Sequence, residues 1–130
     1  MNNKLFFSSE LQTGKTPTDL YNDLDKEFNF DFDPCPENPT FNGLLCNWKQ
    51  SNFINPPYNQ QKAWVAKAYL ESLNDKICVM LLPARTDTKL FHELIIKKAH
   101  EIRFIKGRLR FEQYNNSAPF PSMIVIFKND

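Results

Sequence analysis

The chain has 130 residues and a mass of 15.3 kDa, which fits one compact domain over residues 1–130. Of its residues 42% are apolar, yet no apolar run approaches the roughly 20 residues that cross a bilayer. The formal net charge of +1 is low for a dedicated nucleic-acid binder. The N-terminus has no long apolar segment typical of a signal peptide, so we expect a soluble, cytoplasmic protein.

Three cysteines are present, at Cys35, Cys46 and Cys78. An odd number without a secretion signal argues against a disulfide framework, so we expect reduced thiols. A zinc site typically uses close Cys or His pairs, and the sequence holds no such pair. We therefore expect no metal.

The first predicted elements are a helix and a short strand. In "TPTDLYNDLDKEF", residues 16–28, Thr16 suits the cap and Pro17 the first helical position. The apolar residues that follow repeat on one helical face. "NFDFD", residues 29–33, alternates with a period of two and predicts a strand. The proline-rich loop "DPCPENP" then ends that strand.

The rest of the chain alternates predicted strands and helices. Strands are expected over 51–54, 77–82, 101–105, 108–112 and 122–128, and helices over 59–74 and 85–99. The continuous apolar run at 77–82 suits a strand buried on both faces of a parallel sheet. The two alternating segments around Lys106-Gly107 suit a β-hairpin. The order predicts an α/β fold with a mostly parallel sheet and a hairpin near the C-terminus.

The corner "NPPY", Asn55 to Tyr58, lies between a predicted strand and a predicted helix. Each proline restricts itself and the residue before it, so this backbone is nearly fixed. The Asn55 side-chain oxygen and the Pro56 carbonyl could accept both hydrogens of one exocyclic amine. Tyr58 offers a ring on which a flat base can stack, worth roughly 1–3 kcal/mol. The corner favours chemistry at a planar amine, with an ordinary turn as the alternative.

Several segments of the chain together resemble one family. They are "FFSS", "TPTDLYNDLDKEFNFDFDPC", "NWKQSNFINPPY", "VMLLPARTDTKLFH", "IRFIKGRLRF" and "SAPFPSMIVIF". "NPPY" is similar to the catalytic motif of methyltransferases that act on planar amino groups. The combination looks like the compact phage-type DNA N6-adenine methyltransferases, the phage Dam-like family, some of which would serve restriction-modification through restriction evasion or self-marking.

This resemblance implies a trimmed Rossmann-like methyltransferase fold without a separate target-recognition domain. It implies S-adenosylmethionine as the methyl donor and a flipped adenine in DNA as the acceptor, at a specific site. The catalytic residues it assigns are Asn55, Pro56, Pro57 and Tyr58. The cofactor-binding residues it assigns are Ser8, Thr16, Pro17, Asp33, Pro34, Cys35 and Asn55.

DNA contacts must come from loops around the pocket, because a chain of this length has no room for a gripping domain. Arg85, after a buried strand, is one candidate, with a salt bridge to Asp87 as the alternative. The other candidates are Lys106, Arg108 and Arg110, which a solvated strand face would also explain. We expect weak, salt-sensitive DNA binding, which a homodimer or a partner subunit could strengthen.

Two other functions stay open at the level of the sequence. A non-catalytic subunit that binds DNA or the cofactor would fit the loop "DPCPEN", which lacks the glycines of most methyltransferases, and also Asn42, where an acidic residue is expected. A methyltransferase for another planar amine, in an RNA base or a protein glutamine, would share the "NPPY" motif.

Overall fold

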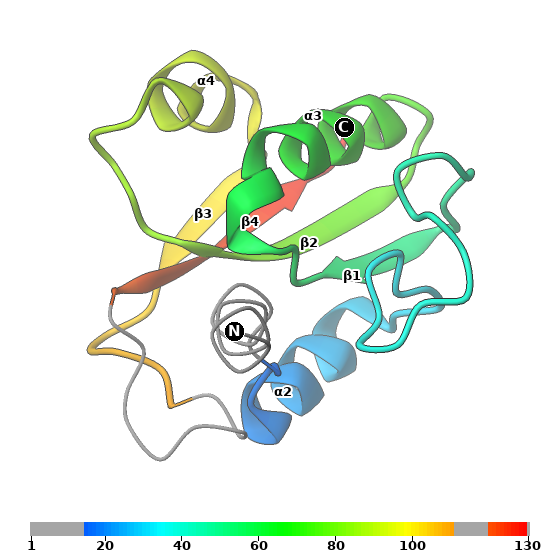
Figure 1. Ribbon diagram of the computed structural model, residues 1–130, viewed down its shortest axis with the longest axis horizontal. Coiled ribbons are helices and arrows are strands. Elements are labelled where there is room, and N and C mark those ends of the chain that lie inside the picture. The colour runs from blue at the N-terminus through cyan, green and yellow to red at the C-terminus, as the bar shows by residue number, and fades with distance from the viewer. Residues whose placement is uncertain (1–14, 111–119, 130) are drawn as a thin grey trace, which may run out of the picture.

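The structure of the chain, a computed structural model, describes residues 15–110 and 120–129 (Figure 1). Its centre is a four-stranded sheet in the order β1-β2-β4-β3. The strands are β1 (Ser51–Ile54), β2 (Ile77–Pro83), β3 (Glu101–Phe104) and β4 (Ser122–Phe127). The α/β class and the positions of these strands agree with the sequence-based expectation.

The prediction of a mostly parallel sheet is wrong. β1 and β2 pair in parallel, but β4 pairs antiparallel with both β2 and β3. β4 is inserted between two strands that run the other way, so only one of the three pairings is parallel. A central strand is buried on both faces whichever way it runs. The apolar run of β4 therefore revealed its burial and not its direction.

The predicted hairpin around Lys106-Gly107 is also wrong. β3 pairs with β4, from Glu101 opposite Ile126 to Phe104 opposite Met123. Residues 108–110 form no strand, and the remainder of the predicted second arm, 111–112, lies outside the described residues. Gly107 still makes a turn, with a φ of 71° that favours glycine.

Helices cover both faces of the sheet (Figure 1). α2 (Thr18–Phe28) lies on one face, where Leu24 packs with Phe53 and with alternate residues of β2 and β4. α3 (Gln61–Ser72) lies on the other, joined by the helical turns η2 (Phe91–Ile95) and α4 (Ile96–Lys98). Because both faces are covered, β2 and β4 must be apolar at successive positions.

Three boundaries differ from the sequence-based ranges. α2 begins at Thr18 with Pro17 in the capping position, so Thr16 precedes the helix and its hydroxyl is available to the site described below. The predicted strand over 29–33 is reduced to one parallel bridge, between Phe32 and Asn52. The third predicted helix starts at 89 rather than 85, because residues 85–88 form a turn.

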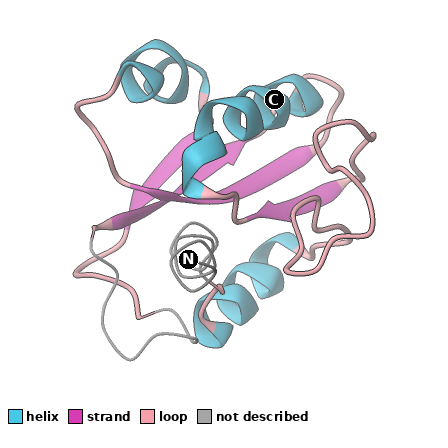
Figure 2. Cartoon of the chain, in the orientation of Figure 1, coloured by secondary structure: helices cyan, strands magenta, loops and turns pink. Residues whose placement is uncertain are grey.

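The loop between α2 and β1 is the longest connection among the described residues (Figure 2). Gly43 allows part of it to pack closely, since a Cβ at this position would lie 1.9 Å from the Pro34 carbonyl oxygen. Trp48 anchors the same loop, donating its indole N–H to the Gly43 carbonyl at 2.7 Å. The loop therefore has a defined path where it leaves Asp33.

Candidate active site

The corner Asn55-Pro56-Pro57-Tyr58 leaves the end of β1 and enters the short helix η1 (Tyr58–Gln60). Asn55 and Pro56 are buried, and Pro57 is extended, with φ −60° and ψ 140°. The Pro57 carbonyl accepts the backbone N–H of Gln60 at 3.1 Å, which closes the turn into the helix. The predicted place of this corner, between a strand and a helix, is confirmed.

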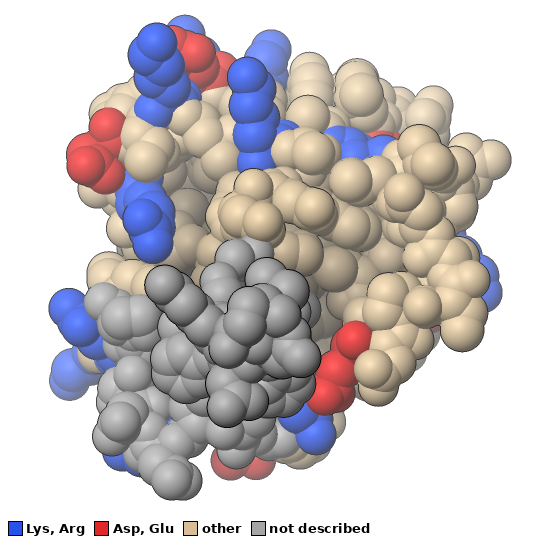
Figure 3. Space-filling view, in the orientation of Figure 1, with Lys and Arg blue, Asp and Glu red and all other residues tan. Residues whose placement is uncertain are grey.

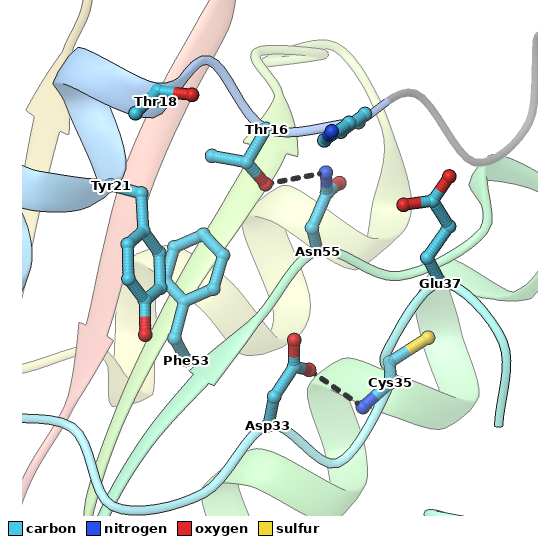
Figure 4. A pocket seen from close by; sticks show the side chains of 9 residues that line it. Thr16, Thr18, Tyr21, Asp33, Cys35, Glu37, Phe53 and Asn55 are labelled. Carbon is cyan, nitrogen blue, oxygen red and sulfur yellow. Dashed lines mark hydrogen bonds between the residues drawn. The ribbon is translucent and has the colours of Figure 1, made fainter. Parts of the chain in front are cut away.

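A cavity of about 260 Å³ opens on one side of this corner (Figure 4). It joins the start of α2, the loop after Asp33 and the end of β1. The structure thus brings together several of the predicted cofactor residues. The residues that line it are Lys15, Thr16, Thr18, Tyr21, Asp33, Cys35, Glu37, Phe53 and Asn55.

Thr16 and Asn55 are in direct contact in this cavity. The Asn55 side-chain Nδ2 donates a hydrogen bond to the Thr16 hydroxyl oxygen at 2.9 Å (Figure 4). The two residues are 39 positions apart, so the contact closes the N-terminal segment onto the end of β1. Pro17 and the buried Pro34 do not line this cavity, and Ser8 lies outside the described residues.

Asp33 places its carboxyl group in the cavity, where it accepts the backbone N–H of Cys35 at 2.9 Å (Figure 4). The residue as a whole is exposed, but protein atoms crowd the carboxyl group. This partial burial raises the pKa of Asp33 from 3.8 to about 6, and the Cys35 hydrogen bond opposes the change. At neutral pH the carboxylate is charged but poorly solvated, so a cation or a hydroxyl donor beside it would stabilise the charge.

The Cys35 side chain belongs to the same strand-end loop. Burial and, secondarily, the charge of Asp33 raise the pKa of the Cys35 thiol to about 11. The thiol is therefore protonated at neutral pH and acts as a small apolar wall rather than a nucleophile.

Five cavity residues were missed by sequence reasoning: Lys15, Thr18, Tyr21, Glu37 and Phe53. The rings of Tyr21 and Phe53 meet edge to face at 5.2 Å and form an aromatic wall. Tyr21 follows Pro17 by one helical turn, a spacing that could have indicated its position. Glu37 was visible as the second acid of the loop "DPCPEN". Asp33 and Glu37 against Lys15 leave one net negative charge in the cavity.

A second cavity, of about 210 Å³, lies beside the other end of the corner. Tyr58 and Arg85 both line it, so the predicted stacking residue and one predicted DNA contact are neighbours. Its remaining lining residues are Gln61, Leu82, Pro83, Thr88, Leu90, Ile95 and Met123.

The ring of Phe120 contacts both Tyr58 and Arg85. Its ring meets that of Tyr58 edge to face at 4.8 Å, and the Arg85 guanidinium lies 5.7 Å from its centre. Phe120 precedes β4, and the Ala84 backbone N–H donates to the Pro121 carbonyl at 2.8 Å, which holds this segment beside the end of β2. Phe120 stands in the segment "SAPFPSMIVIF", and the sequence predicted no site role for it.

A third cavity, of about 460 Å³, shares Cys35 with the first and is also lined by two aromatic residues. Phe41 and Trp64 face it, together with Pro57 of the corner. Its other lining residues are Pro34, Pro39, Thr40, Asn42, Gly43 and Gln60.

The remaining predicted DNA contacts are not at the cavities. Lys106, Arg108 and Arg110 are exposed on the loop that follows β3 and line none of the three cavities. Basic side chains are visible along the edge of the molecule over this loop (left in Figure 3).

Within residues 15–110 and 120–129, no cluster of three or more His, Cys, Asp or Glu side chains is arranged to hold a metal ion. In the same part of the chain, no helix is long and apolar enough to cross a membrane.

Comparison with known proteins identifies the family. Residues 8–129 match the family model described as DNA N-6-adenine-methyltransferase (Dam). Because the match spans nearly the whole chain, the chain belongs to this family of methyltransferases, whose members modify adenine in DNA. A comparison with curated proteins finds no matching sequence.

Proposed function

We propose that this chain transfers a methyl group from S-adenosylmethionine to the N6 amine of a flipped adenine in DNA, at the corner Asn55 to Tyr58. One observation carries the proposal: the first and last residues of one rigid corner line two different cavities, Asn55 the charged one and Tyr58 the one that Arg85 also lines. An in-line methyl transfer needs the donor sulfur and the acceptor nitrogen held close together on opposite sides of the methyl group, and two cavities that meet at one corner could hold them so.

The first cavity suits the amino-acid end of S-adenosylmethionine. That molecule carries a sulfonium and an ammonium against one carboxylate, and so has a net positive charge that complements the cavity. Asp33 and Glu37 would bind the ammonium or ribose hydroxyls, and Lys15 would face the carboxylate. The third cavity, with Phe41 and Trp64, would take the purine end, since it adjoins the first at Cys35. The trimmed sheet is then a reduced Rossmann-like scaffold.

The acceptor amine would lie between the Asn55 side-chain oxygen and the Pro56 carbonyl. An exocyclic amine of adenine is a weak nucleophile because its lone pair is delocalised into the ring. Two acceptors aimed at its hydrogens favour the pyramidal nitrogen that frees this lone pair. S-adenosylmethionine would supply the methyl group from its sulfonium: as the N–C bond forms, the S–C bond breaks and S-adenosylhomocysteine leaves, after which the amine proton would pass to water. No general base is required beforehand.

Tyr58 and Phe120 would hold the adenine ring. Their rings meet at right angles 4.8 Å apart, so a base stacked on one would contact the edge of the other. Arg85 lies over Phe120 and would reach a phosphate next to the flipped nucleotide. Flipping costs a few kcal/mol, which stacking of roughly 1–3 kcal/mol on an aromatic ring partly offsets.

Duplex binding would rest on Arg85 together with the exposed Lys106, Arg108 and Arg110. So few phosphate contacts give weak, salt-sensitive binding and modest site specificity. A second copy of the chain or a partner subunit would add contacts.

The test uses purified chain with radiolabelled S-adenosylmethionine and, separately, unmethylated duplex DNA, RNA and protein extract. We expect label in DNA only, recovered as N6-methyladenine after digestion. Label in RNA or protein instead would favour another planar amine. DNA binding without any label would favour a non-catalytic subunit.

A further inference from the structure

We propose that Thr16 is a positioning residue for the Asn55 amide: its hydroxyl accepts the amide N–H and thereby directs the amide oxygen toward the acceptor amine. This role rests on the proposed function and differs from the cofactor contact expected of Thr16. The hydrogen bond between Asn55 Nδ2 and the Thr16 hydroxyl oxygen is 2.9 Å long.

The argument begins with the geometry of the carboxamide. Oδ1 and Nδ2 are bonded to the same planar carbon and point in different directions, so fixing the direction of Nδ2 also fixes that of Oδ1. If Oδ1 is to accept from the target amine, Nδ2 must donate elsewhere. Asn55 is only 8% exposed, so an Nδ2 without an acceptor would carry a desolvation cost. The Thr16 hydroxyl supplies that acceptor.

The position of Thr16 makes this contact rigid. Thr16 immediately precedes the capping residue Pro17, whose φ of −57° is fixed by its ring. The Pro17 carbonyl accepts the Tyr21 backbone N–H at 3.0 Å, which ties the segment to the first turn of α2. On the other side, Asn55 is held by β1 and by the prolines that follow it. Both ends of the hydrogen bond are thus set before substrate binds.

The substitution Thr16→Val removes the acceptor at nearly constant volume, and Thr16→Ser keeps it. We expect Thr16→Val to lower kcat about tenfold at saturating substrates, the loss of one hydrogen bond, and Thr16→Ser to restore most of it. The dissociation constant for S-adenosylmethionine, from calorimetry, should change by less than about twofold in both variants. Thr86→Val, at an exposed threonine that lines none of the three cavities, is the matched control.

A second readout is independent of activity. In ¹⁵N-labelled protein, the Asn55 side-chain amide is identified by its loss in Asn55→Asp. Its hydrogen exchange should be slow in the wild type and in Thr16→Ser, and about tenfold faster in Thr16→Val.

The outcomes separate the two proposals. A Thr16→Val variant with unchanged kcat, or one whose affinity for S-adenosylmethionine falls as much as kcat, would overturn the positioning role. Failure of Thr16→Ser to restore kcat would overturn it as well. A wild type with slow Asn55 exchange that forms no N6-methyladenine would refute the proposed function, and the catalytic part of the role would fall with it.

Discussion

The Asp33 carboxylate is charged at neutral pH, although the partial burial of its carboxyl group disfavours the charged form. Its pKa, raised to about 6 by partial burial, means that the folded chain binds this proton more tightly than the unfolded chain. The free energy of unfolding therefore falls as pH rises from about 4 through 6, where the carboxylate becomes charged. In the proposed function this cost is explained by a role of Asp33 in binding rather than in stability.

Replacement of Asp33 by Asn should separate stability from binding. Above pH 6 the Asp33→Asn variant should melt at a higher temperature than the wild type, and near pH 4 the difference should disappear. Its affinity for S-adenosylmethionine should be lower at pH 7.5, and the wild type should lose affinity as pH falls through 6. Thermal melts and calorimetry across this range check both. A variant that melts lower than the wild type at pH 7.5 would contradict the account.

Substitution of Asn55 should reduce methyl transfer more than cofactor binding, whereas substitution of Asp33 should reduce cofactor binding first. We expect Asn55→Ala to reduce methyl transfer by a factor of a hundred or more, on the order of the loss of one preorganised transition-state contact. Binding of S-adenosylmethionine should be largely kept, because the charged residues of the cavity, Lys15, Asp33 and Glu37, remain. If Asn55→Ala instead lost cofactor binding while Asp33→Ala kept it, the two roles would be reversed.

At the scale of elements, close packing of the loop after Asp33 positions the first and third cavities. Gly43 is closely packed, because an added Cβ would lie 1.9 Å from the Pro34 carbonyl oxygen and 2.8 Å from the Trp64 ring. Gly107 provides a contrast: it has a positive φ, but no atom lies within 4 Å of an added Cβ.

We therefore expect Gly43→Ala to destabilise the chain by about 3 kcal/mol through overpacking, and Gly107→Ala by about 1 kcal/mol through backbone strain alone. Urea titrations of both variants measure this difference. Gly43→Ala should also weaken binding of S-adenosylmethionine, since both cavities share this loop. Equal destabilisation by the two substitutions would show that the loop is not closely packed at Gly43.

The sequence predicted what is encoded locally. The rigidity of Asn55 to Tyr58 follows from two prolines, and the strand ends follow from apolar runs, so the corner and its strand–helix setting were correct. Contacts between residues that are far apart in the chain were harder to predict from the sequence. β4 runs antiparallel to β2, but a strand buried on both faces has the same apolar residue pattern in either direction. Phe120 meets Tyr58 only because β4 returns beside β2.

At the scale of the whole molecule, the proposed function requires this chain of 130 residues to hold both of its substrates, S-adenosylmethionine and DNA. The predicted DNA contacts lie apart from the charged cavity: Arg85 is beside Tyr58, and Lys106, Arg108 and Arg110 are on the loop after β3. An ion pair from Arg103 to Glu27, at 2.6 Å, instead links β3 to α2, so this arginine has a structural partner.

The salt dependence of DNA affinity should accordingly reflect a small number of phosphate contacts. For B-DNA each neutralised phosphate contributes about 0.9 to the slope of log affinity against log salt. Replacing Lys106, Arg108 and Arg110 by Ala should lower that slope by roughly 3 at most, without affecting S-adenosylmethionine binding. Fluorescence anisotropy with duplex DNA measures the slope. An unchanged slope would assign DNA binding to other residues.

The most direct test of the central claim is the methylated product itself. Wild-type chain, radiolabelled S-adenosylmethionine and unmethylated duplex DNA are incubated, and the digested nucleosides are separated. The account predicts label in N6-methyladenine, lost in Asn55→Ala. Label in any other nucleoside, or DNA that stays unlabelled although both substrates bind, would contradict it.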